Sequence, residues 1–112
     1  MNKKIAIPSE NGILAAHFGH CAAFSIFKTE GKEIIKKTII DAPPHQPGLL
    51  PRFLAEKGVT DVIAGGIGQK AITLFNQHGI NVFAGAPQEE IQTIARGFLN
   101  STIEFSANYC DH

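Results

Sequence analysis

The sequence predicts an α/β fold, in which a mixed five-stranded sheet carries helices packed on it. In the second half of the chain, short apolar runs alternate with segments whose apolar residues recur at helical spacing. Such alternation is typical of parallel strands joined by right-handed crossovers. In the first half, two segments rich in β-branched and aromatic residues flank a short turn, which predicts an antiparallel hairpin at one side of the sheet.

Three strands are expected before the first helix, over residues 3–8, 23–29 and 33–40. Residues 9–21 have no clear periodicity and are expected to form a loop, with at most a short helical turn. The turn signal at residues 30–32 makes the second and third strands a hairpin. Residues 41–48 are expected to be a loop, because three prolines remove backbone donors and fix φ.

In the second half, helices are expected over residues 49–57 and 69–77 and from Pro87 onward, with strands over residues 61–64 and 80–83. Gly58 and Gly79 follow the first two helices as typical C-terminal residues. Pro87 and the Gln88-Glu89-Glu90 run suit the start of the third helix. With a weakly patterned tail over residues 100–112, the element order is β-β-β-α-β-α-β-α in one domain of residues 1–112.

Composition narrows the class of protein. Hydrophobic residues are 44% and charged residues 18% of the 112 residues, which indicates a globular chain. The formal net charge is zero and no basic cluster interleaves with aromatic residues, so nucleic-acid binding is not expected. The chain has no apolar run suited to a signal peptide or membrane span, so we expect no membrane association and a cytoplasmic location. There the two cysteines are expected to be free or metal-bound rather than in a disulfide.

Histidine and cysteine residues gather in two short stretches. The segment of residues 17–21 holds three of them, the C-terminus holds two, and the proline-rich loop holds one. The candidate metal ligands are His17, His20, Cys21, His45, Cys110 and His112. Imidazole and thiolate bind transition metals and iron–sulfur clusters. Because neither stretch matches a structural zinc spacing, an open site for a preformed cluster is favoured over a closed cage for a bare ion.

Other interpretations of these residues stay open at this point. His17 can be a surface residue beside Phe18 as a core anchor, with Cys21 as a small buried apolar side chain. Cys21 can also be the nucleophile of a thiol enzyme, although no Asn or Asp is clearly placed to orient a base. His45 can be a solvated loop histidine, and Cys110 and His112 can belong to an exposed tail.

A glycine-rich turn joins the fourth predicted strand to the second predicted helix. It consists of Gly65, Gly66, Ile67 and Gly68. Glycines at such a turn let the backbone approach an anion, and the helix start supplies free N–H groups. The turn is neither a dinucleotide fingerprint nor a phosphate loop. It suits an anionic metal–sulfur cluster, and the alternative is an anion- or nucleotide-binding regulatory module.

Several motifs occur together in one order along the chain. They are a first strand ending near Pro8, His17-Phe18-Gly19 followed by Phe24, the His45-x-Pro-Gly48 loop, Leu54-Ala55-Glu56-Lys57-Gly58-Val59, Asp61-Val62-Ile63-Ala64-Gly65-Gly66-Ile67-Gly68, Gly79-Ile80 and Gly85-Ala86. With these motifs the chain resembles the nitrogenase iron–molybdenum cofactor family, which comprises NifX-like proteins, the NifB C-terminal region and free-standing small proteins. The similarity covers nearly the whole chain.

The resemblance implies a ribonuclease-H-like three-layer fold. It also implies binding or carrying of an iron–sulfur or iron–molybdenum-type cluster in cofactor assembly or delivery, and not catalysis. The expected partners are proteins that donate or accept the metallocluster, and the expected state is a monomer or weak homo-oligomer. The likeness to ribonuclease H is of fold alone, because three aspartates supply no carboxylate set for two-metal nuclease chemistry.

Overall fold

The computed structural model describes residues 2–16, 18, 23–42, 49–103, 105 and 107–109. Its strands are β1 (Asn2–Glu10), β2 (Ile13–Leu14), β3 (Ala23–Glu30), β4 (Glu33–Asp41), β5 (Asp61–Ile63), β6 (Asn81–Ala84) and β7 (Ala107–Tyr109). Its helices are α1 (Leu49–Glu56), α2 (Gln69–Gln77) and α3 (Ile91–Leu99). None of the helices in these residues is long and apolar enough to cross a membrane.

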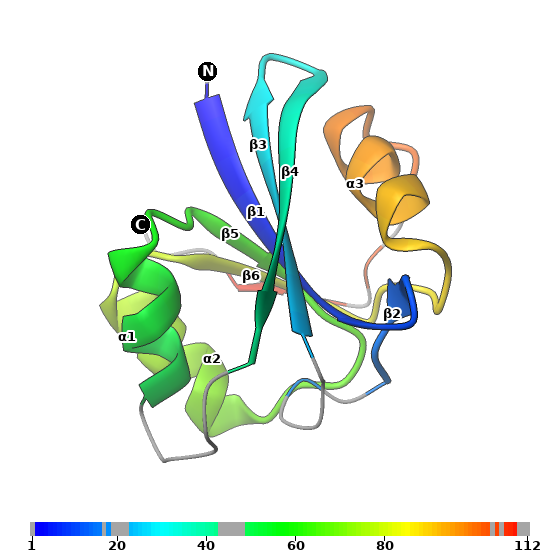
Figure 1. The fold of residues 1–112 in the computed structure, drawn as a ribbon. Helices are drawn as coiled ribbons and strands as arrows, with labels where there is room; N and C mark the ends of the chain where they lie inside the picture. The colour runs from blue at the N-terminus through cyan, green and yellow to red at the C-terminus, as the bar shows by residue number, and fades with distance from the viewer. Residues whose placement is uncertain are drawn as a thin grey trace.

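The strands form one mixed sheet in the order β4-β3-β1-β5-β6-β7, and β2 pairs with β1 beside this path. β1, β5 and β6 are mutually parallel, and β3 and β4 form the predicted antiparallel hairpin (Figure 1). The mixed sheet and the hairpin are thus confirmed. The predicted count of five strands is wrong, because β2 and β7 also join the sheet. These strands have two and three residues, too few to show an alternating pattern in the sequence.

Helices cover both faces of the sheet (Figure 1). Successive side chains of a strand point to opposite faces, so each strand supplies two cores. Ala6 of β1 belongs to one buried cluster, together with Leu54 of α1 and Phe75 of α2. Ile5 belongs to the other cluster, together with Ile94 of α3. The parallel strands are therefore covered on both sides, as is usual for such strands.

The helix boundaries agree with the sequence except at one place. α1 and α2 end before Gly58 and Gly79, whose φ angles of 83° and 74° suit glycine. α3 begins at Ile91 and not at the predicted Pro87. The backbone before it is used by the β2 segment, since the Leu14 N–H donates to the Glu89 carbonyl at 3.0 Å. The Ile91 N–H likewise donates to the Gly12 carbonyl at 3.1 Å.

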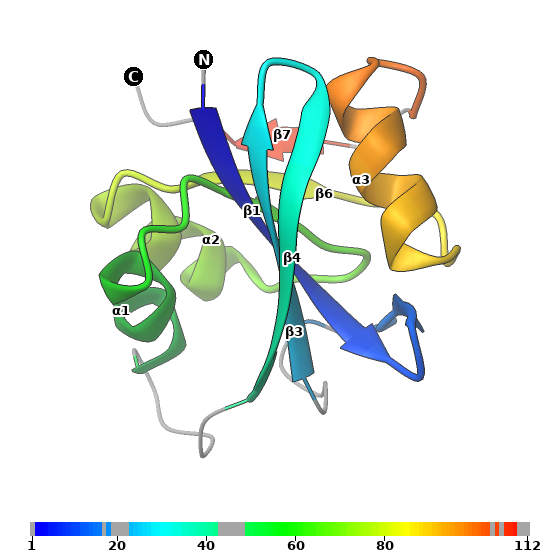
Figure 2. The same cartoon turned by 45° about the horizontal axis from the view of Figure 1, so that its top comes forward.

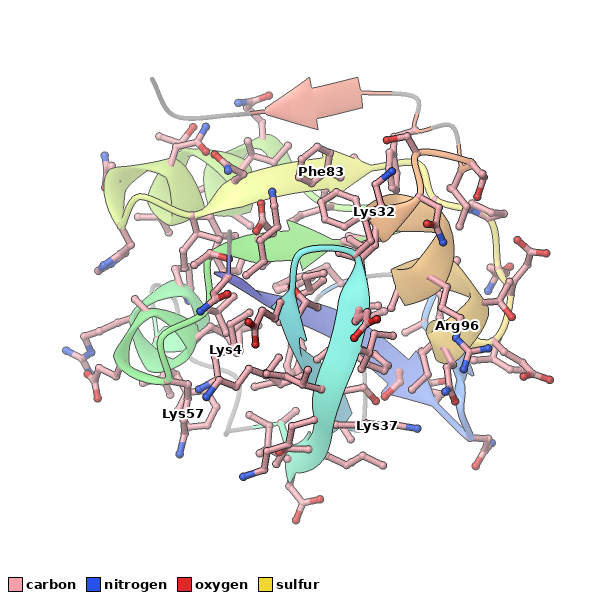
Figure 3. All side chains as sticks on the ribbon, turned by 90° about the horizontal axis from the view of Figure 1, so that it is seen from above. Lys4, Lys32, Lys37, Lys57, Phe83 and Arg96 are labelled. Carbon is pink, nitrogen blue, oxygen red and sulfur yellow. The ribbon has the colours of Figure 1, made fainter. Side chains whose placement is uncertain are left out.

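A polar network joins the amino ends of the three parallel strands. Asp61, which is 1% exposed, accepts hydrogen bonds from the Thr60 hydroxyl at 2.7 Å and the Asn81 amide at 3.2 Å. The Lys3 ammonium lies 3.8 Å from the same carboxylate. Nearby, the Lys4 ammonium donates to a backbone carbonyl after α1 (Figure 3). Polar side chains therefore hold this end of the sheet.

Candidate functional site at the carboxyl ends of the parallel strands

The glycine-rich turn follows β5 at the carboxyl end of the parallel strands. The Gly85 N–H donates to the Gly65 carbonyl at 2.8 Å. The residues that follow β5 and β6 are therefore hydrogen-bonded beyond the ends of the two strands. A Cβ atom on Gly65 would lie 3.3 Å from the Ala16 carbonyl oxygen and 3.6 Å from that of Ala15. Glycine at position 65 therefore allows three backbone segments to approach one another closely.

Two hydrogen bonds join this turn to the segment that follows β2. The Gly66 N–H donates to the Ala16 carbonyl at 2.9 Å, and the Phe18 N–H donates to the Gly66 carbonyl at 2.9 Å. We call this pair of bonds the backbone clamp. The clamp engages the Gly66 N–H with the Ala16 carbonyl. The neighbouring helix start is the other source of N–H groups at the turn.

Two helix starts bring partial positive charge of the main chain to this end of the sheet. Gly68 is the N-cap of α2, with φ −77° and ψ 152°, and it supplies no capping side chain. The first N–H groups of a helix have no acceptor within the helix, and they carry partial positive charge. Neither α1 nor α2 has an acidic residue in its first turn. Both helices start on the side where β3 begins and β4 ends (Figure 2), so both positive ends lie there.

Phe18 anchors the segment to the core, as one of the sequence interpretations proposed. Its side chain is 5% exposed. Its ring centroid lies 5.5 Å from that of Phe24 and 5.2 Å from that of Phe75. These tilted and edge-on contacts add to the apolar burial. The clamp and this aromatic cluster together fix the chain immediately before and after position 17.

Two further segments with candidate ligands adjoin described residues at the same edge. Ala23 at the beginning of β3 pairs with Ser9 on one side and with Asp41 on the other. The segments of residues 19–22 and 43–48 therefore leave neighbouring strands at the same end of the sheet. That end also holds the glycine-rich turn, because β1 and β5 are parallel. Ligands of open α/β sheets commonly bind beyond the carboxyl ends of the parallel strands.

The predicted metal-binding side chains lie outside the described residues. They are His17, His20, Cys21, His45, Cys110 and His112. Within the described ranges, no group of three His, Cys, Asp or Glu residues lies close enough together to hold a metal ion. His78 is the C-cap of α2.

β7 leads toward the opposite end of the parallel strands. It pairs antiparallel with β6, so that Tyr109 lies opposite Val82 and Ala107 lies opposite Ala84. The chain therefore approaches Cys110 while running away from the glycine-rich turn. With four strand spacings of about 4.8 Å between β3 and β7, their backbones are separated by roughly 19 Å across the sheet.

The fold and this edge define a small α/β protein in which a glycine-rich turn and two helix starts lie beyond the carboxyl ends of the parallel strands. The model of the dinitrogenase iron-molybdenum cofactor family matches residues 1–101. The chain belongs to this family, which confirms the resemblance seen in the sequence.

Relatives share both sequence and fold with this chain. The uncharacterized protein MJ0580 of Methanocaldococcus jannaschii is 37% identical over 106 residues, which cover 90% of this chain and 89% of the relative. The crystal structure of PH0822 superimposes with a TM-score of 0.85 at 28% identity and covers 92% of this chain and 94% of that one. The apo form of the orange protein from Desulfovibrio gigas has the same fold, with a TM-score of 0.76, 20% identity and coverage of 96% and 95%.

The ribonuclease-H-like classification of this fold stays a prediction.

Proposed function

We propose that this protein reversibly binds a preformed, anionic iron–sulfur or iron–molybdenum-type cluster beyond the carboxyl ends of its parallel strands. The observation that carries the proposal is the backbone clamp. It holds Ala16 and Phe18, the sequence neighbours of His17, against the turn that starts α2. In this proposal the imidazole of His17 would bind the cluster beside the start of α2. Family membership independently favours a role connected with this cofactor.

We propose His17, His20, Cys21 and His45 as the ligands. The pairing of Ala23 with Asp41 supports this set, because the segments that contain these residues leave the sheet at one edge. Thiolate and imidazole would coordinate the metal ions. The N-termini of α1 and α2 would offset the negative charge of the cluster. The protein would capture a cluster and pass it to an acceptor protein, without catalysing a reaction.

Cys110 and His112 require a separate assignment. The sequence places them in the same site, but the register of β7 supports a location toward the other end of the sheet. A metal–sulfur bond is only ~2.3 Å long, so one metal ion cannot join side chains anchored far apart. We therefore propose that Cys110 and His112 do not ligate the cluster held by the first four residues.

Anaerobic reconstitution tests the proposal. The purified full chain is incubated with ferrous iron and sulfide, with or without tetrathiomolybdate, and desalted. Visible absorption and metal analysis then measure the bound cluster. We expect Cys21→Ser and His45→Ala each to lose most of the bound metal, and Cys110→Ser to retain it. His78→Ala is the matched histidine control, because His78 lies at the C-terminal end of α2.

The outcomes separate the proposed ligands from the alternatives. Equal metal binding by the parent and a Cys21→Ser/His45→Ala double variant would show that the ligand assignment is wrong. Loss of metal in Cys110→Ser would restore the shared site that the sequence suggests. Calorimetric titration of metal-free protein with ATP tests the nucleotide-binding alternative. We expect no saturable heat, because the turn lacks the Lys and Ser/Thr of a phosphate loop.

A further inference from the structure

β4 is an exposed edge of the sheet. It ends the strand order and spans nine residues. Three large apolar side chains of the described residues are exposed, namely Ile13 at 45%, Ile35 at 50% and Ile39 at 61%. Two of these belong to β4. An edge strand presents unpaired N–H and C=O groups, which can pair with another strand.

The charges along β4 restrict how two copies of it can pair. In an antiparallel pair related by a twofold axis, the central residue faces itself, and the other residues face their counterparts across the centre. With Lys37 at the centre, the two Lys37 ammonium groups face each other and Glu33 faces Asp41. Like charges directly opposite one another are destabilising. The register that pairs the whole strand is therefore disfavoured.

A register centred on Ile39 removes these repulsions. It places Lys37 opposite Asp41 of the second copy in two equivalent pairs, and it covers Ile39 with its own counterpart. Side chains two residues apart share a face, so the charge pairs flank the apolar contact on one side of the sheet. Lys37 extends from β4 at this position (Figure 3).

The other register with opposite charges is centred on Ile35, where Glu33 would face Lys37. The pairing of β4 with β3 shifts there, from Lys28 opposite Lys36 to Thr29 opposite Ile34. Ile35 is the extra residue of this bulge, and bulges disturb the ladder that a partner strand needs. We propose that β4 pairs antiparallel with β4 of a second copy of this chain, about a twofold axis at Ile39. Because few residues pair, this dimer is weak and depends on concentration.

Charge reversal tests this dimer directly. Sedimentation equilibrium of the full chain over a wide concentration range gives its dissociation constant. We expect Lys37→Asp and Asp41→Lys each to weaken the dimer about tenfold, since each converts two attractive pairs into two repulsive ones. The double variant Lys37→Asp/Asp41→Lys should restore the parent constant. Lys36→Asp is the control with the same charge change on the same strand, because position 36 has no charged counterpart in this register.

Glu33→Lys distinguishes the two registers. It should leave the dimer unchanged if Ile39 is the centre, whereas weakening would move the centre to Ile35 and overturn the proposed register. A chain that stays monomeric at all concentrations would overturn the dimer itself. The proposal would also be overturned if Lys37→Asp left the dissociation constant unchanged, or if the double variant did not return it to the parent value. Circular dichroism of each variant establishes that it is folded.

Discussion

The two ends of the parallel strands are built by different means. At the amino end, side chains make the connections, with the buried carboxylate of Asp61 accepting from Thr60 and Asn81. At the carboxyl end, the glycine-rich turn is connected through the main chain, above all at Gly66, and the Ser9 hydroxyl contacts the Ser25 hydroxyl at 3.3 Å between β1 and β3. The first arrangement commits particular side chains to stability. The second holds the glycine-rich turn without using a side chain of the turn itself, which is compatible with the proposed cluster site.

The largest effect is expected from breaking the amino end. Asp61→Ala removes the acceptor of two hydrogen bonds in a buried position, so we expect unfolding free energy to fall by about 3 kcal/mol. Urea denaturation measures this change. Glu56→Ala is the matched carboxylate control, because Glu56 pairs with Arg52 on the exposed surface at 3.8 Å and should contribute at most about 0.5 kcal/mol. Equal losses in the two variants would contradict a structural role for the amino end.

At the carboxyl end, a smaller loss of stability should be accompanied by reduced cluster loading. Phe18→Leu removes aromatic contacts with Phe24 and Phe75, so we expect about 1 to 2 kcal/mol of destabilisation together with reduced cluster loading. Phe98→Leu removes comparable contacts with Phe83 and Phe105 on the opposite face. It should lower stability similarly without changing metal content. If both variants load equally, Phe18 contributes packing alone.

The smallest effect is expected at the turn itself. Gly65→Ala places a Cβ atom 3.3 Å from the Ala16 carbonyl oxygen, so the clamp must shift by a few tenths of an ångström. We expect about 1 kcal/mol of destabilisation and weaker cluster loading. Gly68→Ala meets no atom within 4 Å, so its effect should be limited to the weaker N-cap preference of alanine, about 0.5 kcal/mol, with unchanged cluster loading. Thermal unfolding and reconstitution compare the pair, and equal behaviour would show that the close approach at Gly65 is unimportant.

The sequence predicted those elements whose own residues determine them. α2 has the predicted bounds of Gln69 and Gln77, because its apolar stripe and the following Gly79 are local signals. The start of α3 was mispredicted, because the backbone at Glu89 is used by a distant segment. The clamp could not be predicted, since every residue except proline carries the same N–H and C=O groups. Gly65 was the one residue whose type indicated the site, because glycine allows the backbone of the Ala16 segment to approach the turn closely.

The position of β1 in the sheet has a consequence for the order of assembly. On one side β1 pairs with β3, which is close in sequence, and on the other it pairs with β5, where Ile5 lies opposite Asp61. Contacts between nearby residues form faster than distant ones, so we expect β1, β3 and β4 to associate before β5 docks. The clamp between Ala16 and Gly66 forms only after that step. We therefore expect a nascent chain to lack the clamp, so that the proposed cluster site exists only in the folded chain.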